Sequence, residues 1–464
     1  MNPRQDVPVP FRTGQEKNGP LTWGQIAIWD VLQWLPADDS SLNALGSCPV
    51  PAGRTVDQVR EALRVLVERH DSLRTLYRET DGRPVQRVLA SGELEVGLYE
   101  AEDRAALDVR TAELGEALRS RPFDSAVDLP LRAAVLSCAG QPVAVLLAVS
   151  HMALDGWSFR IVRDDLEALL TAGADTVLPP PGQQPLERAA YEASERGRNR
   201  EAKALDYWAR GVRDIPASML ESVRGTDAPD FTWARIESPA LALAVRSLAA
   251  RNGLAPAVVL LAAAGLLLSA YKDEDEAALR TIVSTRFRPE SRTLVGAFNQ
   301  NALFRVDIAD EPFGQFLRRA ANAAFQSYSY CEYHPRKLES MVAEIAEQRG
   351  ITPDGYCFFN DARFTLGEQS AAPDPGAAVA MAEGIAKALP ETRLGPLEGN
   401  QTPKGANFFL FLHDLTDRAV LTLCADRRFL APRGSADFLG DLERLTTRAA
   451  VEEVSVRKLR TDFR

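Results

Sequence analysis

The stretch Val143–Ser158, with the sequence VAVLLAVSHMALDGWS, organises the chain. Its first half is an apolar run with several β-branched residues, which is typical of a buried strand. A polar turn containing His151 follows, and the apolar residues between Ile161 and Leu170 then recur at helical spacing. The pattern predicts a strand, a short turn and a helix, with His151 held at the end of the buried strand.

His151 carries the most reactive side chain of this turn. A neutral imidazole is the group best suited to accept a proton near pH 7. Asp155 stands four residues later, where its carboxylate could fix the turn through a hydrogen bond or a salt bridge, and Gly156 permits conformations or close approaches that a Cβ would block. Taken alone, this HxxxDG spacing suits a buried structural histidine equally well.

Length and composition narrow the class of protein. The chain has 464 residues, enough for two lobes with separate cores, and its net charge of −10 argues against a nucleic-acid partner. Its five cysteines are scattered without a CxxC pair, which predicts neither a disulfide framework nor a zinc site and fits the cytoplasm. The longest apolar run, 254–270, is interrupted by Pro256 and falls short of the ~20 residues of a membrane span. We therefore expect a cytoplasmic protein with no membrane partner.

Other kinds of site are excluded around His151. No further histidine, cysteine or carboxylate cluster completes a metal site there, so no metal is expected. The chain has no GxSxG elbow for a serine nucleophile, no Walker A loop and no dinucleotide-binding fingerprint.

Composition and periodicity divide the chain into segments. We expect a flexible leader at 1–19, an N-terminal lobe at 20–172, a proline-rich linker at 173–186 and a C-terminal lobe at 187–464, with a long excursion at about 366–405. Helices are predicted near 56–69, 103–120, 187–212, 255–271, 313–329, 335–348 and 438–445. Strands are predicted near 72–77, 84–89, 131–137, 143–149, 280–284, 302–306, 355–360, 407–412 and 419–424. Both halves are therefore expected to be mixed α/β lobes.

Six motifs follow one another in a fixed order along the chain. They are Leu21–Trp29, Arg69–Thr75, Pro122–Asp124, Ser150–Ser158, Tyr207–Trp208 and Arg286–Phe298. Together they resemble the condensation domains of nonribosomal peptide synthetases, within the chloramphenicol-acetyltransferase-like superfamily. The first, second and fourth look like the family patterns LTxxQxxxW, RHxxLRT and HHxxxDGxS, and the resemblance covers about residues 20–450.

The resemblance implies a fold and a set of roles. The family has two α/β lobes in a V with the active-site tunnel between them. By resemblance, His151 is the catalytic residue at the middle of the tunnel, where an acyl thioester donor meets an acceptor. Asp155 is then structural and pairs with Arg286, while Trp157, Ser158 and Gln300 are possible tunnel residues. The family needs no cofactor of its own, because the donor arrives on the phosphopantetheine arm of a carrier protein.

Three departures from the family pattern stand out. Ser150 replaces the first histidine of the HH pair, and Gln300, between Asn299 and Asn301, replaces an asparagine. No carrier-protein serine motif and no adenylation motif appears in the chain. We therefore expect a free-standing, monomeric enzyme that uses carrier proteins in trans, and the exposed charges Arg196, Arg198, Arg200 and Lys203 are either a docking patch or a solvated helix face.

The leading hypothesis is a condensation enzyme of natural-product biosynthesis that joins a carrier-bound acyl or aminoacyl donor to an amine, or less readily to a hydroxyl. The backbone N–H near Gly156 is the expected donor to the developing oxyanion. One alternative is an acyl-CoA-dependent acyltransferase of the same superfamily, although the DFGWG motif of its plant members is missing. The other is an inactive platform that recruits a tailoring enzyme, which the serine at position 150 keeps open.

Overall fold

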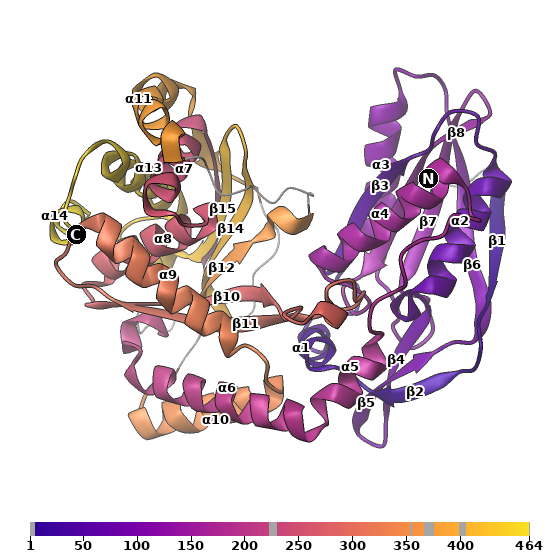
Figure 1. The fold of residues 1–464 in the computed structure, drawn as a ribbon, viewed down its shortest axis with the longest axis horizontal. Coiled ribbons are helices and arrows are strands. Elements are labelled where there is room, and N and C mark those ends of the chain that lie inside the picture. Colours follow the sequence, from indigo (N-terminus) through magenta and orange to yellow (C-terminus); the bar gives the residue numbers. More distant parts are fainter. Residues whose placement is uncertain (1–4, 222–229, 353–354, 366–374, 399–404, 464) are drawn as a thin grey trace. The chain divides into compact units, whose positions relative to one another are not determined.

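The computed structural model describes residues 5–221, 230–352, 355–365, 375–398 and 405–463, and the chain divides into two compact units (Figure 1). Unit 1 comprises Met1–Asn199 and Ser284–Asn299, and unit 2 comprises Arg200–Val283 and Gln300–Arg464. Each unit combines helices with a sheet, which confirms the mixed α/β fold class. The segment 284–299 lies between two strands of unit 2 in the sequence and yet belongs to unit 1.

Unit 1 is built on a five-stranded sheet in the order β1-β6-β7-β8-β3. Its strands are β1 (Gln5–Arg12), β6 (Ser91–Ala101), β7 (Leu131–Cys138), β8 (Gln141–Ser150) and β3 (Asn43–Pro49). Val145, Leu147 and Val149 of β8 pack into the core formed with α2 (Val56–Arg69) and α4 (Gly156–Ala172), and Leu146 packs into the core on the other face, beside α3 (Leu107–Arg119). Burial on both faces explains why the sequence of β8 is apolar without alternation.

A smaller sheet of unit 1 has the order β2-β5-β4, with β2 (Lys17–Pro20), β5 (Arg83–Val88) and β4 (Thr75–Thr80). Helix α1 (Trp23–Leu32) begins at Thr22, whose side chain accepts a hydrogen bond from the backbone of Gln25. The predicted strand 72–77 begins instead as the 3₁₀ turn η1 (Asp71–Arg74), and only its second half is strand.

The expected flexible leader at 1–19 is wrong for the residues that the structure describes. β1 pairs with β6 along its whole length, from Gln5 opposite Leu98 to Arg12 opposite Ser91. Val9 and Phe11 alternate into the core, and both are buried. The polar and proline-rich composition gave no sign of this strand, because its stability comes from pairing with residues 79 to 93 positions further along the chain.

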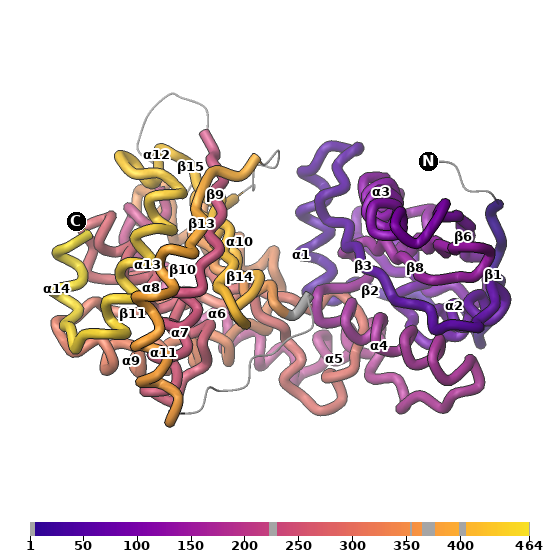
Figure 2. The backbone as a smooth tube through the Cα atoms, turned by 90° about the horizontal axis from the view of Figure 1, so that it is seen from above, coloured from indigo at the N-terminus to yellow at the C-terminus, as the bar shows by residue number. Residues whose placement is uncertain are grey.

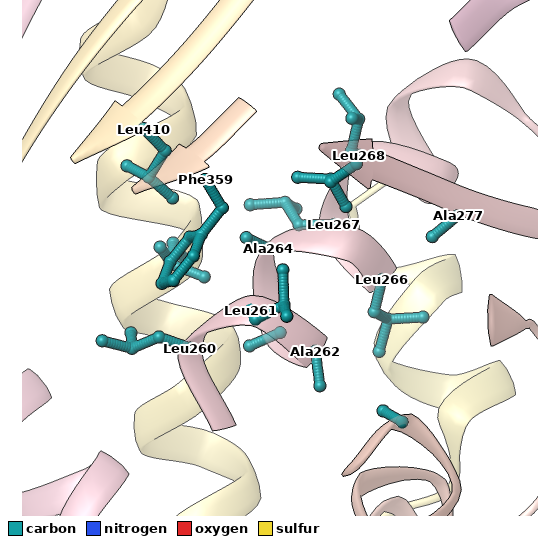
Figure 3. Packing of buried hydrophobic residues seen from close by; sticks show 14 of the residues in the cluster. Leu260, Leu261, Ala262, Ala264, Leu266, Leu267, Leu268, Ala277, Phe359 and Leu410 are labelled. Carbon is teal, nitrogen blue, oxygen red and sulfur yellow. The ribbon is translucent and has the colours of Figure 1, made fainter. Parts of the chain in front are cut away.

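Unit 2 is built on a seven-stranded sheet in the order β11-β10-β12-β14-β15-β9-β13. Its strands are β11 (Asn299–Asp307), β10 (Glu276–Ser284), β12 (Tyr356–Asp361), β14 (Ala406–Leu415), β15 (Ala419–Asp426), β9 (Phe231–Ser238) and β13 (Arg393–Pro396). Figure 2 shows α7 (Pro239–Asn252), α8 (Pro256–Lys272) and α13 (Ser435–Val451) together on one side of this sheet. Leu260, Leu261 and Leu267 of α8 meet Phe359 and Leu410 of the sheet in this core (Figure 3).

The remaining helices lie around these layers. They are α5 (Pro185–Glu192), α6 (Glu195–Asp214), α9 (Phe313–Ser329), α10 (Pro335–Arg349), α11 (Ala378–Ala388), α12 (Arg427–Leu430) and α14 (Val456–Thr461). The short 3₁₀ turns are η2 (Ala217–Met219), η3 (Pro289–Ser291), η4 (Ala362–Thr365), η5 (Pro375–Ala377) and η6 (Leu389–Glu391).

The expected segment boundaries differ from the observed units in two places. Residues 173–184 of the proline-rich stretch contain no helix or strand, but unit 2 begins at Arg200, inside α6, rather than at residue 187. Parts of the expected excursion at 366–405 lie outside the described residues. Its described part, 375–398, contains α11 and the edge strand β13, which pairs with β9.

No single helix among the described residues is long and apolar enough to cross a membrane, although α7 and α8, bent by 107° at their junction, pass that test as a pair. Both helices are largely buried in the core of unit 2.

We predict that Leu266→Ala lowers the free energy of unfolding by about 2–5 kcal/mol, because Leu266 of α8 is fully buried and its loss leaves a cavity. The matched control is Leu389→Ala, whose side chain is 42% exposed in the same unit and should change stability far less. Urea unfolding of both variants is the measurement. Equal effects of the two substitutions would show that α8 is not the packed centre of unit 2.

Candidate active site

The turn between β8 and α4 brings together the residues that the sequence singles out. Ser150 is the last residue of β8, and Asp155 is the N-cap of α4, where its Oδ1 accepts a hydrogen bond from the backbone N–H of Ser158 at 2.9 Å. His151 lies between them, and its own backbone N–H donates to the carbonyl of Leu42 at 3.0 Å. The main chain therefore fixes both ends of the turn that carries His151.

The imidazole of His151 is held in one tautomer. Its Nδ1 lies 2.8 Å from the carbonyl oxygen of Leu154, and a carbonyl oxygen can only accept a hydrogen bond. Nδ1 must therefore carry the proton, which leaves the lone pair of the neutral ring on Nε2. The ring is half-buried, so it is both oriented and reachable. This arrangement provides a positioned proton acceptor.

Ser150 does not disturb this geometry. It is buried, with 7% of its surface exposed, and its backbone N–H donates to the carbonyl of Pro130 at 2.9 Å. Its own carbonyl accepts from the N–H of Ala153, and its Oγ accepts a long hydrogen bond of 3.4 Å from the N–H of Met152. Two backbone hydrogen bonds and one to the hydroxyl thus hold Ser150, the residue that departs from the family pattern.

Asp155 and Arg286 form a buried, bidentate ion pair. Arg286 Nη1 donates to Asp155 Oδ2 at 2.7 Å, and Nη2 donates to Oδ1 at 3.0 Å. Both side chains are almost completely buried. The pairing that the resemblance implied is therefore present, and the Asp155 carboxylate points into the protein rather than toward a reacting group.

The hydrogen-bonding capacity of this pair is filled. The remaining donors of Arg286 reach the carbonyl of Leu294, the hydroxyl of Ser284 and the hydroxyl of Ser158. The two oxygens of Asp155 also accept from the backbone N–H groups of Ser158 and Phe298. Burial by itself raises the pKa of Asp155, but the guanidinium and these N–H donors outweigh it, so the pKa lies below its ordinary value. The pair is ionised at neutral pH.

Residues of several motifs hydrogen-bond to the segment 294–298 or pack closely against it. The carbonyl of Gly296 accepts from the backbone N–H of Asp155, at 3.1 Å, and from the hydroxyl of Ser158, at 2.8 Å. Ser72 of the second motif donates its hydroxyl to the carbonyl of Val295. Gly24 of the first motif leaves no room for a side chain, since a Cβ there would lie 2.2 Å from the carbonyl oxygen of Ala297. Three separate motifs thus converge on one segment of the sixth motif.

The other predicted site residues have varied surroundings. Trp157 is half-buried and its indole N–H donates to the carbonyl of Arg292 at 3.1 Å, whereas Ser158 is fully buried in the ion-pair network. Gly156 is the first residue of α4 and does not have a positive φ. An unusual backbone conformation therefore does not explain why a glycine occupies this position. Gln300 is buried on β11 of unit 2, where its amide donates to the carbonyl of Tyr333. The role of each in a tunnel stays a prediction.

Sequence reasoning missed the carbonyl oxygens of Leu42 and Leu154, which fix the His151 turn and its tautomer. Backbone acceptors leave no trace in residue type, so no sequence signal pointed to them. No group of three or more histidine, cysteine or acidic side chains that could hold a metal occurs in the described residues.

Comparison with known proteins places the chain in a family. The model described as "Condensation domain" matches residues 16–350. Phosphinothricin tripeptide synthetase PhsC of Streptomyces viridochromogenes is 30% identical over 367 residues, which cover 75% of this chain and 33% of PhsC. Tyrocidine synthase 3 of Brevibacillus parabrevis is 28% identical over 69% of this chain and 5% of its own length. The chain belongs to the condensation-domain family, and it spans a third or less of these two relatives.

Solved structures share the fold. The SgcC5 protein of Streptomyces globisporus matches with a TM-score of 0.67 and 18% identity, covering 93% of this chain and 98% of SgcC5. A structure of condensation-domain-mediated chain release from the enacyloxin polyketide synthase matches with a TM-score of 0.69 and 21% identity, covering 95% and 84% of the two chains. The fold is the two-lobe, chloramphenicol-acetyltransferase-like fold of condensation domains. Members of this family are transferases that form amide bonds, and they act with carrier domains that bear phosphopantetheine.

We predict that Asp155→Asn lowers the free energy of unfolding at pH 7 by about 3–5 kcal/mol, because it leaves the Arg286 guanidinium buried without a counter-charge. The pKa of Asp155 is lowered on folding, so its stabilisation is complete above the unfolded value of about 3.9 and is lost as the pH falls through the folded pKa. The difference between wild type and variant should therefore shrink below about pH 4. Urea unfolding across this range is the measurement.

Asp164→Asn is the matched control, since Asp164 lies on the same helix with an exposed side chain and pairs with the surface arginines Arg160 and Arg163. It should change stability by no more than about 1 kcal/mol at pH 7. If Asp155→Asn behaved like Asp164→Asn, the ion pair would not be holding the segment 294–298.

Proposed function

We propose that this chain catalyses condensation: it transfers an acyl or aminoacyl group from the phosphopantetheine thiol of a carrier protein to an amine acceptor, forming an amide. The observation that supports this most is the His151 turn. The contact between His151 Nδ1 and the Leu154 carbonyl leaves Nε2 as the proton acceptor on a half-buried ring at the start of α4. Family membership supplies the reaction class.

Amide formation from an amine acceptor does not require a strong general base. An α-amine titrates near ~8, so an appreciable fraction is already nucleophilic at neutral pH. As the C–N bond forms, the nitrogen becomes acidic and Nε2 of His151 can take its proton. The C–S bond then breaks, and the proton passes to the leaving thiolate, so the imidazole ends neutral. A hydroxyl acceptor would need a stronger base, and ester formation is accordingly the less favoured outcome.

The oxyanion of the tetrahedral adduct needs hydrogen-bond donors. The first N–H groups of a helix have no intrahelical partner, and α4 begins directly after Asp155 with the N–H of Gly156. The helix dipole also favours negative charge at this end. Asp155 caps Ser158 and not Gly156, which supports the Gly156 N–H as the oxyanion donor.

The partners remain part of the proposal. We propose that a carrier protein presents the donor in a cytoplasmic reaction, and the use of carrier domains by the condensation-domain family supports the choice of partner. The arginines and the lysine at 196, 198, 200 and 203 are exposed on α6, and we assign them to docking of an acidic carrier. Arg200 also pairs with Glu332 at 3.2 Å.

We predict that His151→Ala lowers the rate of amide formation by about 10²–10⁴-fold, the usual contribution of a positioned acid or base. The melting temperature should stay unchanged, because the backbone N–H of His151 still bonds to Leu42. Mass spectrometry of acyl-loaded carrier proteins incubated with amines measures the product. Near-full activity of His151→Ala would contradict the proposed role of the imidazole.

The same assay separates the rival functions. Transfer from acyl-CoA at a rate equal to or above that from the acyl-carrier would favour a coenzyme-A-dependent acyltransferase. Failure of the wild type on every carrier-bound donor, together with stable capture of an oxygenase or another tailoring enzyme, would favour an inactive platform.

A further inference from the structure

The sheet of unit 2 carries two different sets of side chains on its two faces. Along β12 and β14 the side chains alternate between a buried face, packed against the helices, and a half-buried face. The buried side chains include Phe359, Phe408, Leu410 and Leu412, all members of the core. The half-buried ones include Phe358, Phe409, Phe411 and His413.

The half-buried rings stand parallel to one another. The centroids of Phe409 and Phe411 are 4.2 Å apart with planes at 10°, and Phe358 stacks on Phe409 at 5.0 Å and 11°. His413 continues the series beyond Phe411 at 5.9 Å and 10°, and Trp233 of β9 stacks on Phe411 at 6.3 Å and 16°. We call these five residues the aromatic row.

The aromatic row is packed unlike the rings around Phe438 in the core on the other face of the same sheet. There, Phe408 meets Phe438 at 72° and Tyr271 meets Phe438 at 79°, both edge to face. Offset-stacked and edge-to-face contacts are both favoured arrangements of aromatic pairs. The row differs in that its parallel rings stand in a line and leave a series of equivalent edges.

Strand geometry directs those edges away from the sheet. Side chains in strands stand roughly perpendicular to the sheet, so parallel rings of residues two apart on β14 stand upright. The neighbouring strand β15 places only Thr422 and Cys424 opposite Phe411 and Phe409, and across these small residues Trp233 reaches Phe411. The result is a narrow strip of ring edges, which carry the positive part of the aromatic quadrupole.

A polar group closes one end of the strip. Nε2 of His413 lies 3.0 Å from the hydroxyl of Thr422, which fixes the ring. Burial, with Arg235 nearby, lowers the pKa of His413, so the imidazole is neutral at pH 7 and stacks as an uncharged ring. The strip is thus apolar along its length and carries a fixed polar ring at one end.

We propose that the aromatic row binds a planar aromatic group of the substrate. The negative face of a flat ring laid across the upright edges contacts two or more positive edges at once, the arrangement that aromatic pairs prefer. A protein partner fits less well, because the row rings are only half-exposed, unlike Phe325 on α9, which is 74% exposed. This inference rests on the proposed function, since it names the class of donor or acceptor that the enzyme would take.

The test uses two ligands of the same length, 3-phenylpropanoate and 3-cyclohexylpropanoate, titrated into the full chain by calorimetry. The cyclohexyl ligand is the more apolar, so burial of apolar area alone predicts that it binds at least as well. The aromatic row predicts the reverse, with the phenyl ligand bound about two- to tenfold more tightly for each ring edge that meets its face. Phe411→Leu should abolish this preference, because leucine keeps the apolar bulk and removes the ring.

Phe358→Leu, at the end of the row, should reduce the preference and serves if Phe411→Leu folds poorly. Phe325→Leu is the matched control and should leave the preference intact. Equal binding of the two ligands by the wild type, or an equal loss with Phe325→Leu, would overturn the inference. So would a wild-type dimer that Phe411→Leu dissociates in sedimentation, since a second copy would then cover the row.

His151→Ala keeps the two proposals separate, because it should bind the phenyl ligand as the wild type does. If the chain prefers the phenyl ligand through Phe411 but forms no amide from any carrier-bound donor, the aromatic-row inference stands and the proposed function is wrong. If the chain forms the amide but binds the two ligands equally, the proposed function stands and the aromatic-row inference is wrong.

Discussion

The buried ion pair of Asp155 and Arg286 is the constraint on which the rest of unit 1 depends. A charge removed from water costs several kcal/mol unless it is paired and its hydrogen bonds are satisfied. Here both conditions are met, because the guanidinium donates to the carboxylate, two hydroxyls and backbone carbonyls. Neither side chain can move without exposing the other, so the turn after β8 and the segment 294–298 hold each other in place.

The position of the pair also separates architecture from chemistry. Asp155 faces inward and caps α4, whereas His151, four residues earlier, stays half-buried with its Nδ1 bonded to the Leu154 carbonyl. Such a division suits an acyl transfer in which the base must be positioned and not strongly activated. An ionised aspartate beside the imidazole would instead stabilise the imidazolium form.

Much of this could be predicted from sequence, for identifiable reasons. Long periodic or continuous apolar stretches such as β8 and α8 have one plausible structure, and the resemblance to condensation domains implied that Asp155 pairs with Arg286. The strand β1 could not be foreseen, because its polar and proline-rich residues fold only through pairing with β6. The His151 tautomer depends on the Leu154 carbonyl, and a backbone oxygen has no signature in the sequence.

The aromatic row is a second feature that the sequence predicts only in part. Phe409, Phe411 and His413 alternate along β14, and alternation predicts a strand with two different faces. The stacking of Phe358 and Trp233 on these rings, however, depends on β12 and β9, which lie far away in the chain, and on the small residues of β15 beside β14. Register across the sheet adds these two rings to the three of β14, and the sequence of one strand does not reveal it.

The segment 284–299 has a consequence for the way in which the chain is made. Unit 1 is complete only when this segment joins it, 85 residues after Asn199. During synthesis from the N-terminus, Asp155 therefore emerges long before Arg286, and its carboxylate has no counter-ion until two strands and two core helices of unit 2 have followed. No single cut in the chain yields unit 1 intact, because part of unit 2 lies between its two segments in the sequence. The two units therefore alternate along the chain and are not two domains in series.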